Sequence, residues 1–112
     1  DVFCKIIQGE LPAEVVHETQ DFLVIKDIHP EAPVHLLIIA KKHFESLHEL
    51  KASDATLLGQ ALLTAQEAAE KAGIGEKGYR LIINEGTDGG KLVPHFHIHL
   101  LGGKQLGLKI LG

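Results

Sequence analysis

Hydrophobic positions along the chain fall into short runs and alternations that predict a sheet. The stretch VHLLIIA, residues 34–40, is apolar on both faces, which is typical of a central strand. Four other short stretches are rich in β-branched or aromatic residues and predict further strands at residues 13–18, 21–28, 79–84 and 95–101. Together these segments predict one antiparallel sheet of about five strands.

A recurrence of apolar residues at three- and four-residue steps predicts one long helix after the central strand. Ser53 is its predicted N-cap, Asp54 lies in its first turn, and Gly73 and Gly75 follow its end. The apolar positions form a single stripe, made of Leu58, Ala61, Leu62, Ala65, Ala68, Ala69 and Ala72. So many alanines indicate a close approach to a flat partner, either the sheet or a second copy of the chain.

Near the amino end, apolar residues at positions 3, 6 and 7 precede Gly9, and this spacing predicts a short helix. The elements together predict the α+β fold class, with one long and one short helix beside the sheet. At 112 residues, without a repeat or a linker, the chain is expected to form a single domain over residues 1–112.

Charge and cysteine content narrow the classes of partner and compartment. The formal net charge of -4 argues against a nucleic-acid polymer as partner, since such proteins present basic faces. No apolar run approaches the roughly 20 residues that cross a membrane, so no membrane partner is expected. The single cysteine, Cys4, excludes an internal disulfide and favours a reducing compartment, the cytoplasm.

The stretch HFHIHLL, residues 95–101, places histidines at every second position. Successive strand side chains point to opposite faces, so His95, His97 and His99 are expected on one face, with apolar residues on the other. Neighbouring histidines would stand ~6.8 Å apart and the outer two ~13 Å, which suits an extended anion better than one metal ion. Near neutral pH, imidazole can attack phosphorus or donate to a phosphate oxygen.

Two further features support a phosphate site. Gly89 and Gly90 precede the histidine row and allow backbone N–H groups to turn toward an anion. His35 interrupts the central strand and needs a hydrogen-bond partner, for which the nearest candidates are imidazoles of a neighbouring strand. The spacing alone also allows an inert histidine-rich strand or a fortuitous metal-binding surface.

The row at 95–101 resembles the signature of the histidine triad (HIT) nucleotide hydrolases and transferases, and the whole chain resembles their Hint branch. The other segments that carry the resemblance are FCKIIQGELPA, KDIHPEAPVHLLIIAKKH, KGYRLIINEGTDGG and the LLGG that follows the triad. The resemblance implies the HIT fold, with the sheet continued across a homodimer.

The resemblance also implies a chemistry, that of a purine nucleoside phosphoramidase or adenylyl-amine hydrolase. Such enzymes cleave the P–N bond of AMP-amine or AMP-lysine and release AMP or GMP, with no cofactor required. By position in the motif, His97 is the nucleophile that forms a nucleotidyl-histidine, and His99 contacts the phosphate. His35 orients the row, and His95 is the first triad member.

The nucleotide pocket follows from the same resemblance. Asp27 matches the acid that binds the ribose hydroxyls, and a carboxylate can accept two hydrogen bonds from a diol. Asn84 matches a polar residue near the phosphate and ribose, and Gly90 matches backbone that approaches the phosphate. The apolar wall around the base is matched by Phe3, Ile6, Ile25, Ile28 and Leu37.

Leu92 departs from the family pattern, because many Hint proteins carry a serine there that donates to the leaving nitrogen. Leucine cannot donate, so water, Lys91 or a backbone N–H would have to serve, or another leaving group is preferred. The residues therefore leave open two other functions, a dinucleoside polyphosphate hydrolase and a nucleotide-binding regulatory protein with little turnover.

Some relatives hold a structural zinc through a CxxC near the start, the histidine of a KKH segment and the first triad histidine. The matching positions are Asp1, Cys4, His43 and His95, of which the last three are ordinary zinc ligands and Asp1 offers oxygen. The alternative is a buried free cysteine and a solvated histidine.

Residues outside these patterns are expected at the surface. They are His17, His29 and His48, together with Lys41 and Lys42, which are either solvated or hold acidic groups of the substrate. The end of the chain, residues 104–112, is short compared with the family tail that often reaches the partner's active site.

Overall fold

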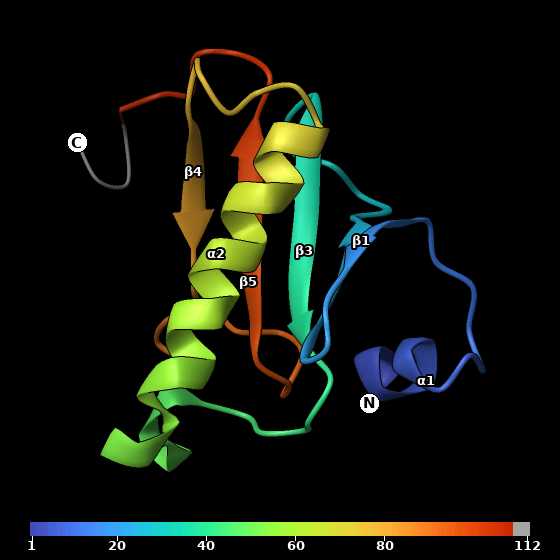
Figure 1. Ribbon diagram of the computed structural model, residues 1–112, viewed down its shortest axis with the longest axis vertical. Coiled ribbons are helices and arrows are strands. Elements are labelled where there is room, and N and C mark those ends of the chain that lie inside the picture. Colours follow the sequence, from blue (N-terminus) through green and yellow to red (C-terminus); the bar gives the residue numbers. More distant parts are fainter. Residues whose placement is uncertain (109–112) are drawn as a thin grey trace.

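A five-stranded antiparallel sheet with strand order β1-β2-β3-β5-β4 forms the frame of the protein. The computed structural model describes residues 1–108. Its strands are β1 (Val15–Glu18), β2 (Phe22–Lys26), β3 (Val34–Ala40), β4 (Tyr79–Ile82) and β5 (His97–Gly102). β3 lies in the middle of the sheet, which confirms the predicted central strand and the α+β class (Figure 1).

Two α-helices lie on opposite faces of this sheet. The long helix α2 (Ala55–Lys71) runs across one face, and the short helix α1 (Val2–Ile7) packs beside the other face near the end of β3 (Figure 1). Two 3-10 turns, Leu47–Glu49 and Ala52–Asp54, connect β3 to α2. Within residues 1–108, no helix combines the length and the apolar character that crossing a bilayer requires.

The alternation of side chains from Phe96 through β5 determines which residues lie on each face of the sheet. Phe96, Ile98 and Leu100 are buried against α2, as predicted. A buried aliphatic side chain of this size contributes about 1.5–3 kcal/mol. His97 and His99 therefore turn to the opposite face, where α1 packs.

The register of β5 surrounds these two histidines with hydrocarbon. His97 pairs with Ile39 and His99 with Leu37 on β3, and paired residues share a face of the sheet. Both partners are buried, so water has restricted access to the imidazole rings. The prediction that all three triad histidines lie on the strand is wrong for His95, because β5 begins at His97.

The alanine stripe of α2 permits the close approach to the sheet that its composition predicted. Ala61, Ala65, Ala68 and Ala69 are almost fully buried. Leu62 was expected in the stripe but is 52% exposed, because the alanine row, together with buried Thr64, occupies the contact and leaves Leu62 at its edge.

The predicted start of α2 is wrong, whereas its predicted end is confirmed. Ser53 is not the N-cap, because the chain makes a 3-10 turn there and the Asp54 carboxylate accepts the Lys51 N–H at 2.9 Å. At the other end Gly73 has φ +77°, and the N–H of Ile74 donates to the Ala69 carbonyl at 3.1 Å. This glycine-dependent C-terminal motif confirms the predicted stop.

Candidate active site

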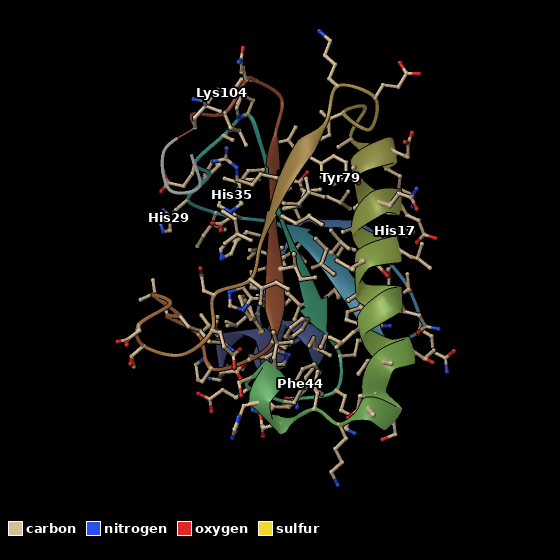
Figure 2. The ribbon with its side chains drawn as sticks, turned by 90° about the vertical axis from the view of Figure 1, so that its left-hand side faces the viewer. His17, His29, His35, Phe44, Tyr79 and Lys104 are labelled. Atoms are coloured by element: carbon tan, nitrogen blue, oxygen red, sulfur yellow. The ribbon has the colours of Figure 1, made fainter. Side chains whose placement is uncertain are left out.

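A cavity of about 520 Å³ opens on the sheet face that α2 leaves uncovered. Figure 2 views the sheet edge-on from the side of β4, with His35 and His29 on the opposite side of the sheet from α2. The structure brings together in this cavity every residue that was predicted to bind a nucleotide: Phe3, Ile6, Ile25, Asp27, Ile28, Leu37, Asn84, Gly90, Leu92, His97 and His99. Their roles remain predictions, but their convergence on one cavity is a fact of the fold.

The apolar wall has a buried floor and an exposed rim. Phe3, Ile25 and Leu37 are buried, whereas Ile28 is 84% and Leu92 93% exposed. Ile28 therefore lies at the mouth of the cavity and does not enclose it. His29, predicted as a plain surface residue, is exposed but also lines this mouth. In the sequence, the position of His29 directly after the predicted pocket residues Asp27 and Ile28 could have indicated that it lies beside the pocket.

The ring of His97 is held in one orientation. Its Nδ1 lies 2.7 Å from the backbone carbonyl oxygen of His95, which can only accept, so Nδ1 carries the proton. The neutral ring then has its lone pair on Nε2. Burial lowers the pKa of His97, and the bond to the His95 carbonyl only partly opposes this. A neutral ring with a free Nε2 in the cavity wall has the form that a base or a nucleophile needs.

A chain of hydrogen bonds likewise assigns the protons of His35 and His99. The backbone N–H of Glu31 donates to Nδ1 of His35 at 3.0 Å, so the proton of a neutral His35 is on Nε2. That Nε2–H donates to Nδ1 of His99 at 3.0 Å, which leaves the His99 proton on Nε2. The prediction that His35 finds its partner among the triad imidazoles is confirmed.

His99 is kept neutral by its surroundings. Burial, followed by the nearby His97 and His35 rings, lowers the pKa of His99 to about 4. Its ring centroid lies 5.1 Å from that of His97. The pair therefore presents an unprotonated nitrogen on His97 and an N–H donor on His99, both beside the same cavity.

Asp27 follows the end of β2 and lies between the cavity and His35. Its Oδ1 accepts the backbone N–H of His29 at 2.8 Å, and its Oδ2 is 3.4 Å from Nε2 of His35. A carboxylate has further lone pairs, so these contacts leave room for hydroxyl donors from a bound sugar.

The glycine loop between β4 and β5 lines the cavity but does not form the predicted anion nest at Gly90. The N–H of Gly90 donates to the Thr87 carbonyl at 3.0 Å, and that of Lys91 donates to Gly86 at 3.1 Å. The absence of a side chain at Gly89 lets its backbone lie close to that of Glu85, because a Cβ there would lie 2.7 Å from the backbone nitrogen of Glu85. Asn84 and His99 also border a second cavity of about 590 Å³, lined by Glu31 and Arg80 among others.

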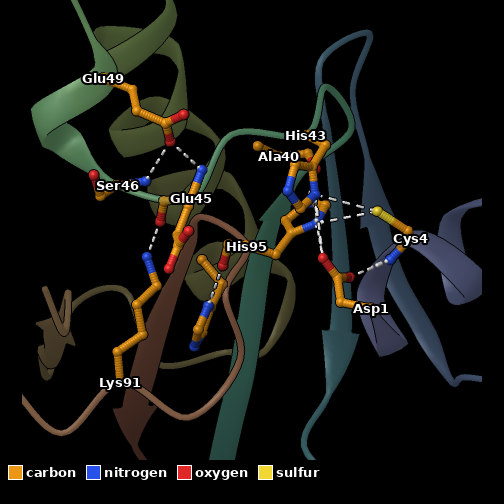
Figure 3. A network of polar contacts seen from close by, with 10 residues as sticks. Asp1, Cys4, Ala40, His43, Glu45, Ser46, Glu49, Lys91 and His95 are labelled. Carbon is orange, nitrogen blue, oxygen red and sulfur yellow. Dashed lines mark hydrogen bonds and ion pairs between the residues drawn. The ribbon is translucent and has the colours of Figure 1, made fainter. Parts of the chain in front are cut away.

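Lys91, Lys41 and His17 make contacts that the sequence did not predict. Lys91 donates to the Glu45 carbonyl, and Lys41 pairs with Glu18 at 2.6 Å, so neither ammonium group points to the cavity (Figure 3 for Lys91). His17 was predicted at the surface, but its Nε2 lies 2.9 Å from Glu67 on α2 and its side chain is only 15% exposed. The packing of β1 against α2 encloses it.

His95 points away from the cavity into a separate cluster with Asp1, Cys4 and His43 (Figure 3). Nδ1 of His95 lies 3.1 Å from Nδ1 of His43, 3.2 Å from Oδ2 of Asp1 and 3.5 Å from Sγ of Cys4. Nδ1 of His43 lies 3.3 Å from the same sulfur and 3.1 Å from the same oxygen. The four residues predicted for zinc thus converge on one point.

The chemistry of this cluster fits a tetrahedral metal ion. Bonds of about 2.0–2.3 Å to zinc place neighbouring ligand atoms roughly 3.3–3.8 Å apart, close to the separations seen here. Nε2 of His95 donates to the Ala40 carbonyl at 2.6 Å, so its Nδ1 lone pair faces the cluster. Burial lowers the pKa of His95, which keeps that lone pair available.

Comparison with known proteins gives a consistent result. A family model for the HIT domain matches residues 8–106. An "Uncharacterized HIT-like protein" of Chlamydia muridarum (strain MoPn / Nigg) is 50% identical over 106 residues, which cover 95% of this chain and 83% of that protein.

Two solved structures share the fold. One is described as a HIT family hydrolase from Clostridium thermocellum Cth-393, with TM-score 0.93 and 50% identity, covering 98% of this chain and 96% of the other. The second is described as a Zn-bound histidine triad family protein from Mycobacterium smegmatis, with TM-score 0.77 and 30% identity, covering 97% and 78%.

Proposed function

Because the chain belongs to the HIT domain family, we propose that it is a nucleotide hydrolase of the Hint type. Its proposed substrates are purine nucleoside phosphoramidates such as AMP-amine and AMP-lysine, and its products are the free amine and AMP or GMP. The resemblance to a HIT family hydrolase supports the reaction class. The finer assignment rests on the residues of the cavity.

The observation that carries the proposal is the proton arrangement along the histidines. His97 offers an unprotonated Nε2 because its Nδ1–H is bound to His95, and His99 offers an Nε2–H because its Nδ1 accepts from His35. A nucleophile beside a fixed donor is what attack at a phosphoryl group requires.

In the first proposed step, the Nε2 lone pair of His97 forms a bond to phosphorus while the P–N bond to the amine breaks. The electron pair of that bond stays on the leaving nitrogen, which takes up one proton from water. Leu92 has no donor group, and the Lys91 ammonium is bound to Glu45. The N–H of His99 donates to a phosphate oxygen as negative charge moves onto it.

In the second step, a water oxygen forms a bond to phosphorus and the bond from His97 to phosphorus breaks. His97 recovers its lone pair, and the proton released by the water replaces the one consumed earlier. The net change is hydrolysis of one P–N bond. No metal ion enters this chemistry.

The remainder of the cavity suits a purine nucleoside. The buried apolar floor at Phe3, Ile25 and Leu37 would cover the base, and Asp27 would accept hydrogen bonds from the ribose hydroxyls. Asn84 borders both cavities, a position suited to contact with the phosphate and ribose. The second cavity would receive the leaving group.

We further propose a homodimer in which the sheet continues through β4. β4 is an edge strand of the sheet, and an unpaired edge can add a strand from a second copy. Leu62 and Leu63 on α2 and Ile83 after β4 are exposed apolar side chains that a partner could cover.

The cluster of Asp1, Cys4, His43 and His95 is proposed to hold a structural zinc ion. Its converging ligand atoms support this, as does the zinc in the related mycobacterial protein. A cytoplasmic location would keep Cys4 reduced and able to bind metal as thiolate.

An assay with two substrate classes tests the function. Fast release of amine from an adenosine phosphoramidate, with slow cleavage of a diadenosine polyphosphate, is expected. The reverse preference would identify a dinucleoside polyphosphate hydrolase, and tight AMP binding without turnover would identify a regulatory nucleotide-binding protein. The His97→Ala variant should lose turnover while its circular dichroism spectrum is retained.

A further inference from the structure

Helix α1 supplies residues to two different places in the molecule. Cys4 and the N-cap residue Asp1 reach into the four-residue cluster, while Phe3 and Ile6 line the nucleotide cavity. The Asp1 side chain serves twice, because its Oδ1 accepts the Cys4 N–H at 2.8 Å and its Oδ2 faces His43 and His95. The position of α1 therefore affects both sites at once.

The cluster is the polar attachment of α1 to the rest of the protein. Among residues 1–108, the side-chain polar contacts that Asp1 and Cys4 make outside the helix go to His43 and His95. A helix of 6 residues has little stability of its own, so its position depends on such contacts and on Phe3.

His95 connects the cluster to His97. Its ring, with no exposed surface, belongs to the cluster, and its backbone carbonyl holds Nδ1 of His97. Phe3 contacts both rings edge-on, with centroid separations of 5.9 Å to His95 and 5.0 Å to His97. Phe3, which lines the cavity, thus packs directly against His95, which belongs to the cluster.

We propose that Asp1, Cys4 and His43 are positioning residues of the nucleotide cavity, through a divalent metal ion that they hold together with His95. With the ion bound, α1 is fixed against the sheet and Phe3 is held over the cavity. Metal binding and nucleotide binding therefore strengthen each other. The inference rests on the proposed metal site and the proposed nucleotide pocket.

Thermodynamic linkage makes the proposal quantitative. If zinc raises the affinity for AMP by some factor, AMP must raise the affinity for zinc by the same factor. Coupling between sites in proteins commonly amounts to about 5- to 150-fold, and we expect a factor in that range. A metal that only stabilised the fold would leave the AMP affinity of the folded chain unchanged.

The test measures both affinities on the full chain. Calorimetry with AMP is performed on zinc-loaded protein and on protein stripped with a chelator, after metal content has been determined by elemental analysis. Zinc affinity is then measured in metal buffers with and without saturating AMP. Weaker AMP binding in stripped protein, by about 5-fold or more, and a matching change in zinc affinity are expected.

Variants supply the controls. Cys4→Ala should lose the metal and bind AMP like stripped wild type, with no further effect of the chelator. Lys5→Ala is the matched control, since Lys5 is exposed on the same helix and outside both sites. Asp1→Cys should bind zinc more tightly and keep the coupling. Hydrogen exchange of α1 amides should slow when zinc is added to the wild type.

The outcomes separate the inference from its premises. One zinc ion per chain with equal AMP affinities in loaded and stripped wild type would overturn the coupling and leave the metal site standing. Absence of bound zinc would overturn the metal site and the inference, while the phosphoramidate assay would still decide the function. Absence of AMP binding in both states would count against the nucleotide pocket itself.

Discussion

The Nδ1 atom of His97 lies 2.7 Å from the backbone carbonyl oxygen of His95. This single contact decides which nitrogen of His97 is free, because a carbonyl oxygen accepts hydrogen bonds and cannot donate them. It also separates the roles of the two residues. His95 contributes its backbone carbonyl to the orientation of His97 and its ring to the cluster around Cys4.

We predict that a covalent intermediate forms on His97 and on no other member of the row. His99 has Nδ1 bonded to His35 and a proton on Nε2, and both ring nitrogens of His95 face other partners. Rapid denaturation of wild type during turnover of an adenosine phosphoramidate, followed by peptide mass spectrometry, should find the added nucleotide on His97. An adduct on His95 or His99 would contradict the tautomer assignment.

His35 is predicted to contribute to turnover through its hydrogen bond to His99, without contacting the substrate itself. His35→Ala removes the donor to Nδ1 of His99 and should lower kcat/KM by roughly 10- to 100-fold, the value of a hydrogen bond to a group that stabilises charge. His35→Gln retains a donor and should recover part of the loss. Equal losses in both variants, measured at equal thermal stability, would show that the hydrogen bond is not the cause.

Leu92→Ser is predicted to change the leaving-group preference. Leu92 is 93% exposed at the cavity mouth, so the substitution should alter the free energy of unfolding by no more than about 0.5 kcal/mol. A hydroxyl there could donate to the leaving nitrogen, so poorly basic and strongly basic amines should respond differently in the first step. Formation of the nucleotidyl intermediate should persist. The same rate change for every leaving group would rule out this role.

The lowered pKa of His99 predicts a pH dependence of stability. Its pKa is about 4 in the folded protein, against about 6.5 for an unfolded chain. Between these values the unfolded chain binds a proton that the folded protein does not, so the stability contributed by the neutral state is complete above pH 6.5. It is lost as the pH falls from 6.5 toward 4. Imidazole nitrogen NMR should show His99 titrating near pH 4, and titration at pH 6.5 or above would show that the pKa of His99 is not lowered.

The part of the site that could be predicted from the sequence depends on the period of two along a strand. Phe96, Ile98 and Leu100 must be buried, and this requirement turns His97 and His99 to the other face. The position of the His95 ring could not be derived in this way. It depends on where β5 begins and on contacts with residues more than 90 positions away, at Asp1 and Cys4.

The fold shows the same division between local and distant causes. The strands and the glycine at the end of α2 follow from local patterns, and the structure confirms them. The exposure of Leu62 and the enclosure of His17 depend on how the sheet and α2 meet. Helical spacing alone does not determine the rotation of a helix about its axis to within one residue.

Gly89→Ala is predicted to impair catalysis as well as stability. A Cβ at Gly89 would lie 2.7 Å from the backbone nitrogen of Glu85 and would also meet the Glu85 carbonyl, so the loop must shift. Lys91 and Glu85 attach this loop to Glu45 and Leu47, and the shift would move Asn84 and Gly90 at the cavity. Misplacement by ~1 Å can cost about 100-fold in rate, while the overpacking costs about 1–3 kcal/mol of stability.

Gly107→Ala is the matched control, since a Cβ there meets nothing within 4 Å. Both variants are compared by kcat/KM and by urea unfolding. Because the control adds the same methyl group without displacing backbone, it should match wild type in both measurements. Wild-type turnover in Gly89→Ala would mean either that the loop shifts without moving Asn84 and Gly90 or that these residues do not contribute to turnover, and either result contradicts the prediction.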